Sequence, residues 1–460
     1  MSAIIDDKVV AGAKSANIVK EDPIVALTEK VNALYFFRDH YFENHSIEEA
    51  IKKNNDLEKE MKDTLNKFDE CKGYEIDGSR AKYYYLKGKA LNVTERFIPQ
   101  AEELLTKAVK LEPNLVEAWN ELGECYWKND DIQQAKNCFV GALRHGKNKV
   151  SLRNLSMVFR QEPILNVEQR MQNIQKGVEH AKEAVSLDTT DGISWAILGN
   201  AYLSSFFTVA QNPAILRLCM SAYAQAEKDI VAGSNPDLFH NKAVALKYQE
   251  EYSLALKSFE RAMLLDPLWE TPRNKRDELL QYLKDVQNSV NNSGRVKPKR
   301  LYQMIRALDV KHLGPYKGGS FTSGQKTVKL DLILLKDLVL GLNPEKVIFG
   351  KVVCWIQDTD CVPLFTNTSN FFSAFCLVDE EKTCIAVTVY NLAKGRGVTV
   401  GDSVAIPEPF VIHQKFSYLN NDFDFKSIRV ETPVILVVNG RKLGREQEAS
   451  AKLHTFKKTD

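Results

Sequence analysis

The sequence predicts an α+β protein of more than one domain, in which an all-α superhelix is followed by a small all-β barrel. Three observations predict this fold. A helical repeat recurs between Tyr84 and Pro267, the pattern changes to short runs rich in β-branched and aromatic residues from Val328 onward, and a basic segment containing Gly294 and Pro298 separates the two. At about 150 residues per domain, the 460-residue chain accommodates about three domains, or one long array with an added module.

The repeat follows the tetratricopeptide pattern W-x2-L-G-x2-Y and then A-x3-F-x2-A. The fullest copy consists of Trp119, Leu122, Gly123, Tyr126, Ala135, Phe139 and Ala142. Four partial copies are in register with it: Tyr84, Gly88, Ala101, Leu105, Ala108 and Pro113; Leu152, Leu155, Ser156, Phe159, Ala181 and Ala184; Trp195, Leu198, Gly199, Tyr202, Tyr223 and Ala226; and Phe239, Ala243, Ala255, Phe259, Ala262 and Pro267. Small residues at fixed places let antiparallel helices approach, and large residues fill the interface. The five copies therefore predict a tetratricopeptide superhelix.

Three stretches depart from the ideal repeat, namely Asn92 to Gln100, Arg160 to Gly177 and Ser204 to Ala214. Such insertions usually form loops on one face of the superhelix, often the binding face, although simple drift explains them equally well. Before the array, residues 24–71 are amphipathic and rich in charge, and they predict a helical hairpin. Its second helix is predicted to begin with a capping box of Ser46 and Glu49.

The second module carries six short runs with strand character, and turn signals separate them. These runs are Lys346 to Gln357, Phe372 to Val378, Cys384 to Tyr390, Ser403 to Ile406, Phe423 to Val430 and Pro433 to Val438. The segment GDSVAIPEP, Gly401 to Pro409, resembles a turn and strand of an oligonucleotide/oligosaccharide-binding (OB) barrel, although periodicity alone does not separate a barrel from a sandwich. The expected divisions are a disordered lead at 1–22, a helical hairpin at 23–72, the array with a C-terminal capping helix at 73–290, a basic linker at 291–325, the OB-fold domain at 326–443 and a flexible tail at 444–460.

Composition excludes several classes of protein. The formal charge is only +2, from 62 Lys and Arg against 60 Asp and Glu, which argues against a protein that binds polyanions over its whole surface. No apolar run approaches the roughly 18 residues that a membrane span needs, so we expect no contact with membranes. No secretory signal is recognisable, and the eight cysteines include no CxxC pair. We therefore expect a cytoplasmic and nuclear protein without a disulfide framework.

Catalytic and cofactor motifs are missing from the sequence. It contains no GxxxxGK[ST], GxGxxG after a strand, HExxH or GxSxG, and its histidines are scattered. Pairs such as Cys354 with Cys361, or Cys376 with Cys384, are expected to be buried thiols rather than metal ligands. We expect a protein that is not an enzyme and binds no cofactor or metal, although a catalytic site assembled from distant segments would leave no such motif.

The first helices of the repeats are expected to line an inner groove that binds an extended peptide. Asparagine amides suit a peptide backbone, Arg160 suits a carboxylate, and Asp237 suits an arginine. Any one of these side chains taken alone is better explained by solvation or by an ion pair inside the repeat, whereas the set together favours peptide binding. The predicted contact set is Asn120, Asn154, Arg160, Asn200, Asp237, Asn241 and Lys247, and further groove positions are Glu121, Glu124, Trp127, Lys128, Arg153, Met157, Gln161, His240 and Tyr248.

The basic segment has two interpretations. A run of charge in a linker is usually solvated and nothing more. Beside an OB barrel, however, basic side chains commonly contact nucleic acid. Lys297, Lys299 and Arg300 are therefore the candidates for contact with RNA phosphates.

From about Val31 to Gly440 the chain resembles the family of tetratricopeptide-repeat protein five, also called Strap. The resemblance rests on LYFFRDHYFENHS (34–46), GKALNVT (88–94), KAVKLEPNLVEAWNELGE (107–124), NKVSLRNLSMVFRQ (148–161), SNPDL (234–238), GDSVAIPEP (401–409) and RVETPVILVVNG (429–440). The lead to about Asp22 and the segment CVPLFTNTSN (361–370) are peculiar to this chain.

That resemblance implies a ribosome-associated factor that recognises the Met-Arg-Glu start of nascent α- and β-tubulin and triggers decay of tubulin messages. The family's groove arginine and aspartate match Arg160 in SMVFRQ and Asp237 in SNPDL, and its basic ribosome contact matches Lys297 and Lys299, with Arg295, Arg300 and Ser293 in place of further lysines. The implied partners are the tubulin peptide, ribosomal RNA and protein near the exit tunnel, and adaptor proteins of mRNA decay. A second role implied by the family is a nuclear scaffold that joins an acetyltransferase to stress-responsive transcription factors.

Overall fold

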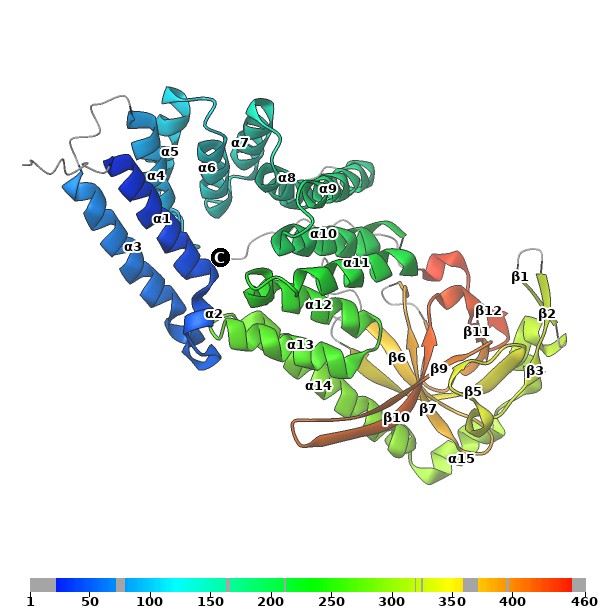
Figure 1. Ribbon diagram of the computed structural model, residues 1–460. Coiled ribbons are helices and arrows are strands. Elements are labelled where there is room, and N and C mark those ends of the chain that lie inside the picture. The colour runs from blue at the N-terminus through cyan, green and yellow to red at the C-terminus, as the bar shows by residue number, and fades with distance from the viewer. Residues whose placement is uncertain are drawn as a thin grey trace, which may run out of the picture.

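The computed structural model describes residues 22–71, 79–162, 166–210, 212–318, 320–323, 326–358, 371–393 and 397–448. A curved stack of helices leads into a β-barrel at its C-terminal end (Figure 1). The predicted α+β architecture is thereby confirmed. Most of the predicted disordered lead and the whole of the segment 361–370 lie outside the described residues.

The helical part is built from antiparallel pairs. A first hairpin is formed by α1 (Pro23–Asp39), the short α2 (Tyr41–Asn44), a 3-10 helix (Ile47–Lys52) and α3 (Lys53–Glu70). Five repeat pairs and a long last helix follow: α4 (Arg80–Leu91) and α5 (Pro99–Leu111), α6 (Val116–Lys128) and α7 (Ile132–His145), α8 (Lys149–Gln161) and α9 (Val167–Leu187), α10 (Gly192–Ser205) and α11 (Pro213–Ala226), α12 (Pro236–Tyr248) and α13 (Tyr252–Leu265), and α14 (Glu270–Asn291).

The signature residues of the repeat act as the spacing predicts. A Cβ atom added at Gly123 would collide with the Phe139 ring, and one added at Gly199 would collide with the Tyr223 ring. Both glycines therefore let an aromatic ring of the second helix pass close to the backbone of the first. The Trp195 indole N–H also donates a hydrogen bond of 2.9 Å to the Thr189 carbonyl. In the α6 repeat, the Trp119 indole N–H donates in the same way to the Pro113 carbonyl at 2.8 Å.

The N-terminal hairpin joins the two ends of the array. Helices α1 and α3 pack on α4 of the first repeat, while the 3-10 helix between them contacts α13 of the last repeat. Figure 1 shows the stack curving round so that the hairpin tip meets α13. The predicted capping box is present, and the Ser46 backbone N–H donates to the Glu49 carboxylate at 3.2 Å.

The β-domain contains twelve short or long strands among the described residues. They are β1 (Ser320–Ser323), β2 (Lys326–Lys329), β3 (Asp331–Leu332), β4 (Gly341–Leu342), β5 (Lys346–Asp358), β6 (Phe371–Val378), β7 (Cys384–Val389), β8 (Ser403–Pro407), β9 (Phe410–Tyr418), β10 (Asn421–Val430), β11 (Val437–Val438) and β12 (Arg441–Lys442). Most of the predicted strands are recovered. Two expectations were wrong: β9 was not predicted, and Pro433–Ile435 is a 3-10 turn that leaves only β11 extended.

Strand pairing closes this sheet into a barrel. Its central order is β8-β5-β6-β7-β10-β9, with β7 and β10 parallel and the other central neighbours antiparallel. Only Glu408 and Pro409 separate β8 from β9, and Glu408 has a positive φ of 43°. These two strands therefore behave as one bent strand that pairs with β5 at one end and with β10 at the other. A five-stranded closed barrel of this kind is the OB topology.

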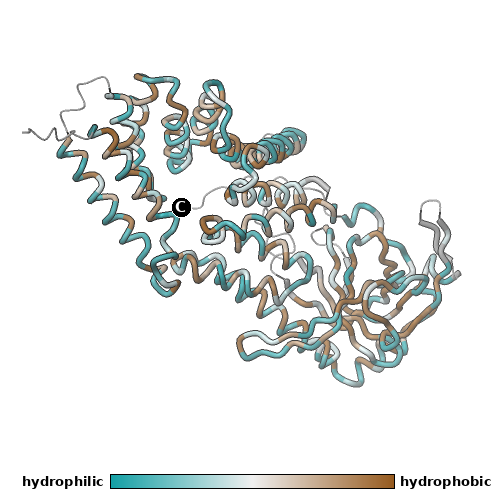
Figure 2. The backbone as a smooth tube through the Cα atoms, viewed as in Figure 1, coloured by the Kyte–Doolittle hydropathy of each residue, from teal (hydrophilic) through white to brown (hydrophobic). Residues whose placement is uncertain are grey.

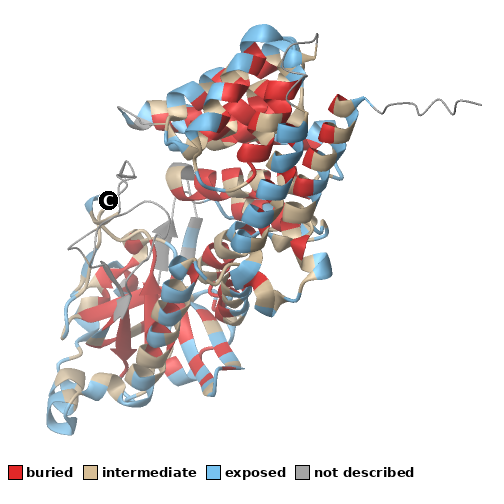
Figure 3. Cartoon of the chain, turned by 90° about the vertical axis from the view of Figure 1, so that its left-hand side faces the viewer, coloured by how far each residue is buried: buried red, intermediate tan, exposed pale blue. Residues whose placement is uncertain are grey.

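Alternation along the barrel strands separates two apolar layers. Side chains such as Phe375, Val387 and Ile428 fill the barrel interior, while Cys376 and Ala386 on the outer face join a cluster with the array. Figure 3 shows buried segments running through both the helical stack and the barrel, and Figure 2 shows hydrophobic residues concentrated in the same strands. The barrel is therefore attached to the array by its own apolar surface.

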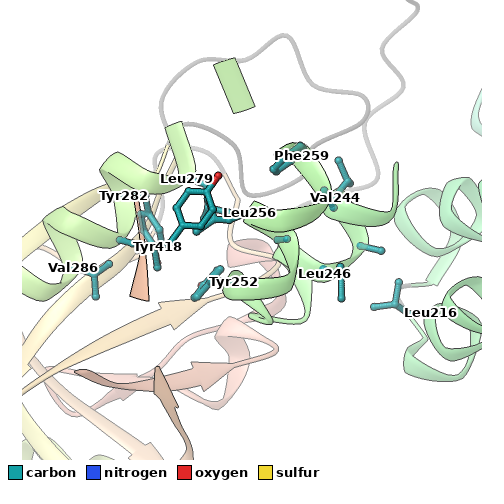
Figure 4. Packing of buried hydrophobic residues seen from close by; sticks show 14 of the residues in the cluster. Leu216, Val244, Leu246, Tyr252, Leu256, Phe259, Leu279, Tyr282, Val286 and Tyr418 are labelled. Carbon is teal, nitrogen blue, oxygen red and sulfur yellow. The ribbon is translucent and has the colours of Figure 1, made fainter. Parts of the chain in front are cut away.

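Helix α14 forms the core of this attachment. Its Leu279, Tyr282, Leu283 and Val286 are buried, and the helix contacts β5, β7 and β10. Figure 4 shows Tyr282 and Val286 of α14 beside Tyr418 of β9. The sequence predicted that α14 would cap the stack; in the structure it is covered by the barrel instead of by solvent.

An ionic contact reinforces the junction. The Arg429 guanidinium of β10 lies 3.1 Å from the Glu250 carboxylate, which is buried in the array, and 3.9 Å from the centroid of the Tyr390 ring. The Tyr390 hydroxyl donates to the same carboxylate at 2.8 Å. Burial raises the pKa of Glu250 while Arg429 opposes that shift, so the buried charge has its partners at the domain boundary.

The predicted linker and tail are more ordered than expected. Within 291–325, α15 (Pro298–Arg306) and a further 3-10 stretch (Val310–Gly318) are formed, and α15 packs on β5. The predicted tail at 444–460 begins with an ordered 3-10 turn (Arg445–Gln447), and Glu448 bridges to Leu392. Apolar side chains such as Leu301 and Ile305 anchor α15, which explains why a charge-rich segment folds. Among the described helices, none has both the length and the hydropathy to cross a membrane.

Candidate peptide-binding groove

The polar side chains of the first half of the inner face, on α4 and α6, are occupied by each other. Glu121 is buried and accepts hydrogen bonds at 3.1 Å from the Asn92 amide and from the Tyr35 hydroxyl of α1. Lys128 donates to the Asn92 side-chain oxygen at 2.9 Å. Burial is the main cause that raises the pKa of Glu121, and the neighbouring Glu124 adds to it. This half of the groove is therefore held together by internal contacts.

Asn120, from the predicted contact set, is also engaged by neighbouring side chains. Its amide nitrogen donates to Asn148 at 3.2 Å, and its carbonyl oxygen accepts from the Ser151 hydroxyl at 2.6 Å. With both ends of the amide bonded and the residue only 7% exposed, Asn120 offers less to a peptide than the other predicted groove residues do. Asn154 is equally buried, but only its nitrogen is engaged, to Glu124 at 3.3 Å.

Arg160 lies at the C-terminal end of α8 with most of its hydrogen-bonding capacity unused. Its Nε donates to the Ser156 carbonyl at 3.0 Å, and among the described residues the guanidinium has no ion pair. A Cβ at Gly177 of α9 would lie 3.2 Å from the Ser156 carbonyl oxygen, the same oxygen that accepts from Arg160, so this glycine lets α9 pass close to the backbone of α8. Burial lowers the pKa of Arg160 to about 10, which still leaves it charged at neutral pH. An unpaired, largely desolvated guanidinium is suited to binding a carboxylate.

Asp237 lies in the first turn of α12 and carries a charge opposite in sign to that of Arg160. Its carboxylate makes no ion pair within the described part of the chain. The side chain keeps access to solvent, yet the surrounding array desolvates it and raises its pKa, and Glu95 and Asp266 raise the pKa further. Three carboxylates that influence one another in this way favour the arrival of a cation.

Two asparagines lie on the neighbouring helices. The Asn241 amide nitrogen of α12 donates to the Asn200 carbonyl oxygen of α10 at 3.1 Å, and both side chains are half-buried. The predicted residues Arg160, Asn200, Asn241 and Asp237 thus come from the first helices of three successive repeats, α8, α10 and α12. Lys247, at the end of α12, already has a partner inside the chain.

The basic residues lie apart from the groove, on the barrel side of α14. Lys297 precedes α15, and Lys299 and Arg300 lie in its first turn. All three are exposed and have no ion pair among the described residues. They present three positive charges on a folded helix, which suits contact with a phosphate backbone.

Sequence analysis missed the contribution of the N-terminal hairpin to the inner face. Tyr35 reaches Glu121, and Arg38 lies 4.3 Å from the centroid of the Tyr35 ring. The signal was present in the aromatic stretch LYFFRDHYF, 34–42, which is unusually rich in rings for a surface hairpin. Repeat positions alone did not reveal it, because the hairpin lies outside the repeat pattern.

Comparison with known proteins places the chain in a family. It is 48% identical to human tetratricopeptide repeat protein 5 over 92% of this chain and 94% of that protein, and 47% identical to the mouse protein over the same shares. The chain belongs to the tetratricopeptide repeat protein 5 family. Residues 329–452 match the family model described as the tetratricopeptide repeat protein 5 OB fold domain, and residues 116–144 match the tetratricopeptide repeat.

Solved structures resemble the array in part. The crystal structure of YrrB, described as a tetratricopeptide protein with an unusual peptide-binding site, is 20% identical and covers 45% of this chain and 97% of its own, with a TM-score of 0.31. TTC0263, a thermophilic tetratricopeptide protein from Thermus thermophilus, is 15% identical and covers 44% of this chain and 99% of its own, with a TM-score of 0.37.

Proposed function

We propose that this protein is an adaptor without enzymatic activity that binds the N-terminal Met-Arg-Glu motif of nascent α- and β-tubulin at the ribosome and triggers decay of the tubulin message. Membership of the family supports an adaptor or scaffold. The observation that carries the finer proposal is a pair of opposite charges, Arg160 and Asp237, left without ion-pair partners in the same half of the groove.

Charge complementarity supports the choice of peptide. The motif offers an arginine, which suits Asp237 with its neighbouring carboxylates Glu95 and Asp266, and a glutamate, which suits Arg160. Asn200 lies on α10, between the helices of Arg160 and Asp237, and Asn241 lies on α12; both are available for the backbone. A peptide with the two charges interchanged would place like charges together and be rejected.

The basic helix α15 supports the proposed contact with ribosomal RNA. In OB folds, nucleic acid commonly binds on the face of the second and third strands, which correspond here to β6 and β7. That face is covered by α14, since Cys376 and Ala386 are buried against Tyr282 and Val286. We therefore assign RNA contact to Lys297, Lys299 and Arg300 rather than to the barrel face.

A charge-exchange experiment tests the groove assignment. Fluorescence anisotropy with a labelled Met-Arg-Glu-Ile peptide should show binding by the wild-type protein and loss of binding by Arg160→Glu. A Met-Arg-Lys-Ile peptide should restore part of the affinity of Arg160→Glu while binding the wild type weakly. If Arg160→Glu binds the original peptide as well as the wild type does, the groove assignment is wrong.

The cellular part of the proposal needs a separate test. Recovery of translating ribosomes with the tagged full-length protein should enrich tubulin messages, and Asp237→Ala should abolish that enrichment. The alternative role as a nuclear scaffold predicts no such enrichment. It also predicts capture of an acetyltransferase that survives substitution of both Arg160 and Asp237.

A further inference from the structure

Tyr223 of α11 has a hydroxyl group that the packing of its repeat does not require. Its ring passes beside Gly199 just as the ring of Phe139 passes beside Gly123 in the α6–α7 repeat. The matching position of the α12–α13 repeat is Phe259, and all three residues are fully buried. Because two of these rings lack a hydroxyl, the extra oxygen of Tyr223 is not needed to fill the interface, and burying it without a partner would be unfavourable.

The hydroxyl reaches the inner face of the array. It donates a hydrogen bond of 2.7 Å to the Asn200 carbonyl oxygen, the same atom that accepts the 3.1 Å hydrogen bond from Asn241. Burial raises the pKa of Tyr223 far above its usual value, and the nearby Arg160 acts against that shift. One hydroxyl on a second helix thus connects two groove asparagines, one on α10 and one on α12.

The bond between the two asparagines determines what they offer to a ligand. An amide side chain has one donor end and one acceptor end. Once the Asn200 oxygen is used by Tyr223 and Asn241, the Asn200 nitrogen remains as a donor and the Asn241 oxygen remains as an acceptor. In an extended peptide the N–H and C=O of one residue point to the same side, so they match such a donor and acceptor pair.

We propose that Tyr223 is a positioning residue of the peptide site, whose hydroxyl fixes the Asn200 amide so that Asn200 and Asn241 together clamp the backbone of one residue of the bound peptide. The inference rests on the proposed function and adds the means by which the groove binds main chain as well as charge. Tyr223 does not touch the peptide itself, and it acts only through Asn200.

The test is a double-mutant cycle measured by anisotropy with the Met-Arg-Glu-Ile peptide. Tyr223→Phe, which installs the residue found at Phe139 and Phe259, should weaken binding about tenfold, and Asn200→Ala should weaken it similarly. The double variant Tyr223→Phe with Asn200→Ala should bind no more weakly than Asn200→Ala alone, because the hydroxyl has lost the group it positions. In contrast, when Tyr223→Phe is combined with Asp237→Asn, the fold-losses of peptide affinity from the two single variants should multiply.

A matched control distinguishes the positioning of Asn200 from a general structural effect of losing a tyrosine hydroxyl. Tyr202→Phe on α10 removes a hydroxyl for which the described residues provide no hydrogen-bond partner, and it should leave affinity unchanged. Thermal unfolding of Tyr223→Phe should stay close to that of the wild type. If Tyr223→Phe binds the peptide as tightly as the wild type does, the inference is wrong while the proposed function stands. The same holds if the affinity losses of Tyr223→Phe and Asn200→Ala multiply in the double variant. Absence of binding by the wild type overturns the proposed function and the inference together.

Discussion

The two halves of the inner face are built from the same repeat but use their polar residues differently. On α4 and α6, Glu121, Asn120 and Lys128 are engaged by neighbouring residues, and Tyr35 of the N-terminal hairpin supplies one of the partners. On α8 and α12, Arg160 and Asp237 form no ion pair with any described residue. Position in the repeat therefore determines which side chains face inward, whereas contacts with neighbouring elements determine which of those side chains remain available to a ligand.

The largest expected effect separates the two halves directly. Arg160→Ala should weaken binding of the Met-Arg-Glu-Ile peptide by about 100-fold or more, because it removes one partner of a desolvated ion pair. Asn120→Ala should change peptide affinity by less than about twofold and instead destabilise the array by about 1–3 kcal/mol, because it removes the acceptor of the buried Ser151 hydroxyl and a donor to Asn148. Anisotropy and urea unfolding measure the two effects. Equal losses of affinity in both variants would remove the distinction between the halves.

The second effect asks whether the groove and the basic helix are independent surfaces. Lys297→Glu combined with Lys299→Glu should lower ribosome affinity by about tenfold at physiological salt and reduce its dependence on salt. Peptide affinity should stay unchanged, because α15 lies on the barrel and away from α8 and α12. Co-sedimentation over a series of salt concentrations measures the first part. Unchanged sedimentation would exclude α15 from ribosome contact.

A third, smaller effect concerns the acidic end of the groove. Desolvation, Glu95 and Asp266 raise the pKa of Asp237, while a bound guanidinium favours its charged form. Affinity should therefore fall as the pH decreases through the raised pKa, which a series of anisotropy titrations at decreasing pH measures. A Met-Arg-Gln-Ile peptide avoids titration of the peptide's own glutamate. The Asp237→Asn variant should show no such slope, and a flat profile in the wild type would contradict the assignment.

The smallest effect is a pH dependence of stability in the first half. Burial raises the pKa of Glu121 above its ordinary 4.5, so the folded state holds the proton more tightly than the unfolded state. The stabilisation is complete below pH 4.5 and is lost as the pH rises through the raised value. Glu121→Gln should therefore gain stability relative to the wild type as the pH increases, measured by urea unfolding at pH 5 and pH 8. A constant difference between the two proteins would show that Glu121 is not shifted.

Much of the candidate site was accessible from the sequence because the repeat has a fixed geometry. Counting from Trp119, Leu152 and Phe239 placed Asn154, Arg160 and Asn241 on first helices, and the structure has them there. The same counting placed Asn120 in the contact set, but it could not show that Asn148 and Ser151, from the next repeat, bond to Asn120. Repeat periodicity describes the orientation of a side chain and carries no information about its partners.

In the barrel, too, local sequence patterns predicted the strands but not their contacts with distant segments. Runs rich in β-branched and aromatic residues, separated by turn signals, predicted β5, β6, β7 and β10. β9 was missed because its buried residues do not alternate regularly with exposed ones and include the polar Gln414, which donates to the Glu250 carbonyl of the array at 2.8 Å. The start of the predicted basic linker is packed against the barrel, since Gly294 fits closely against Cys354 of β5.

The sequence alone determined the helical repeat, the change to β-structure and the side of each first helix that faces inward, because these follow from local periodicity and from the small residues that close packing requires. Only the tertiary structure decided that Glu121 and Asn120 are occupied, that Arg160 and Asp237 are not, and that α14 covers one face of the barrel. Those outcomes depend on which distant segments meet, and burial and electrostatic pairing between such segments leave no periodic trace in the chain.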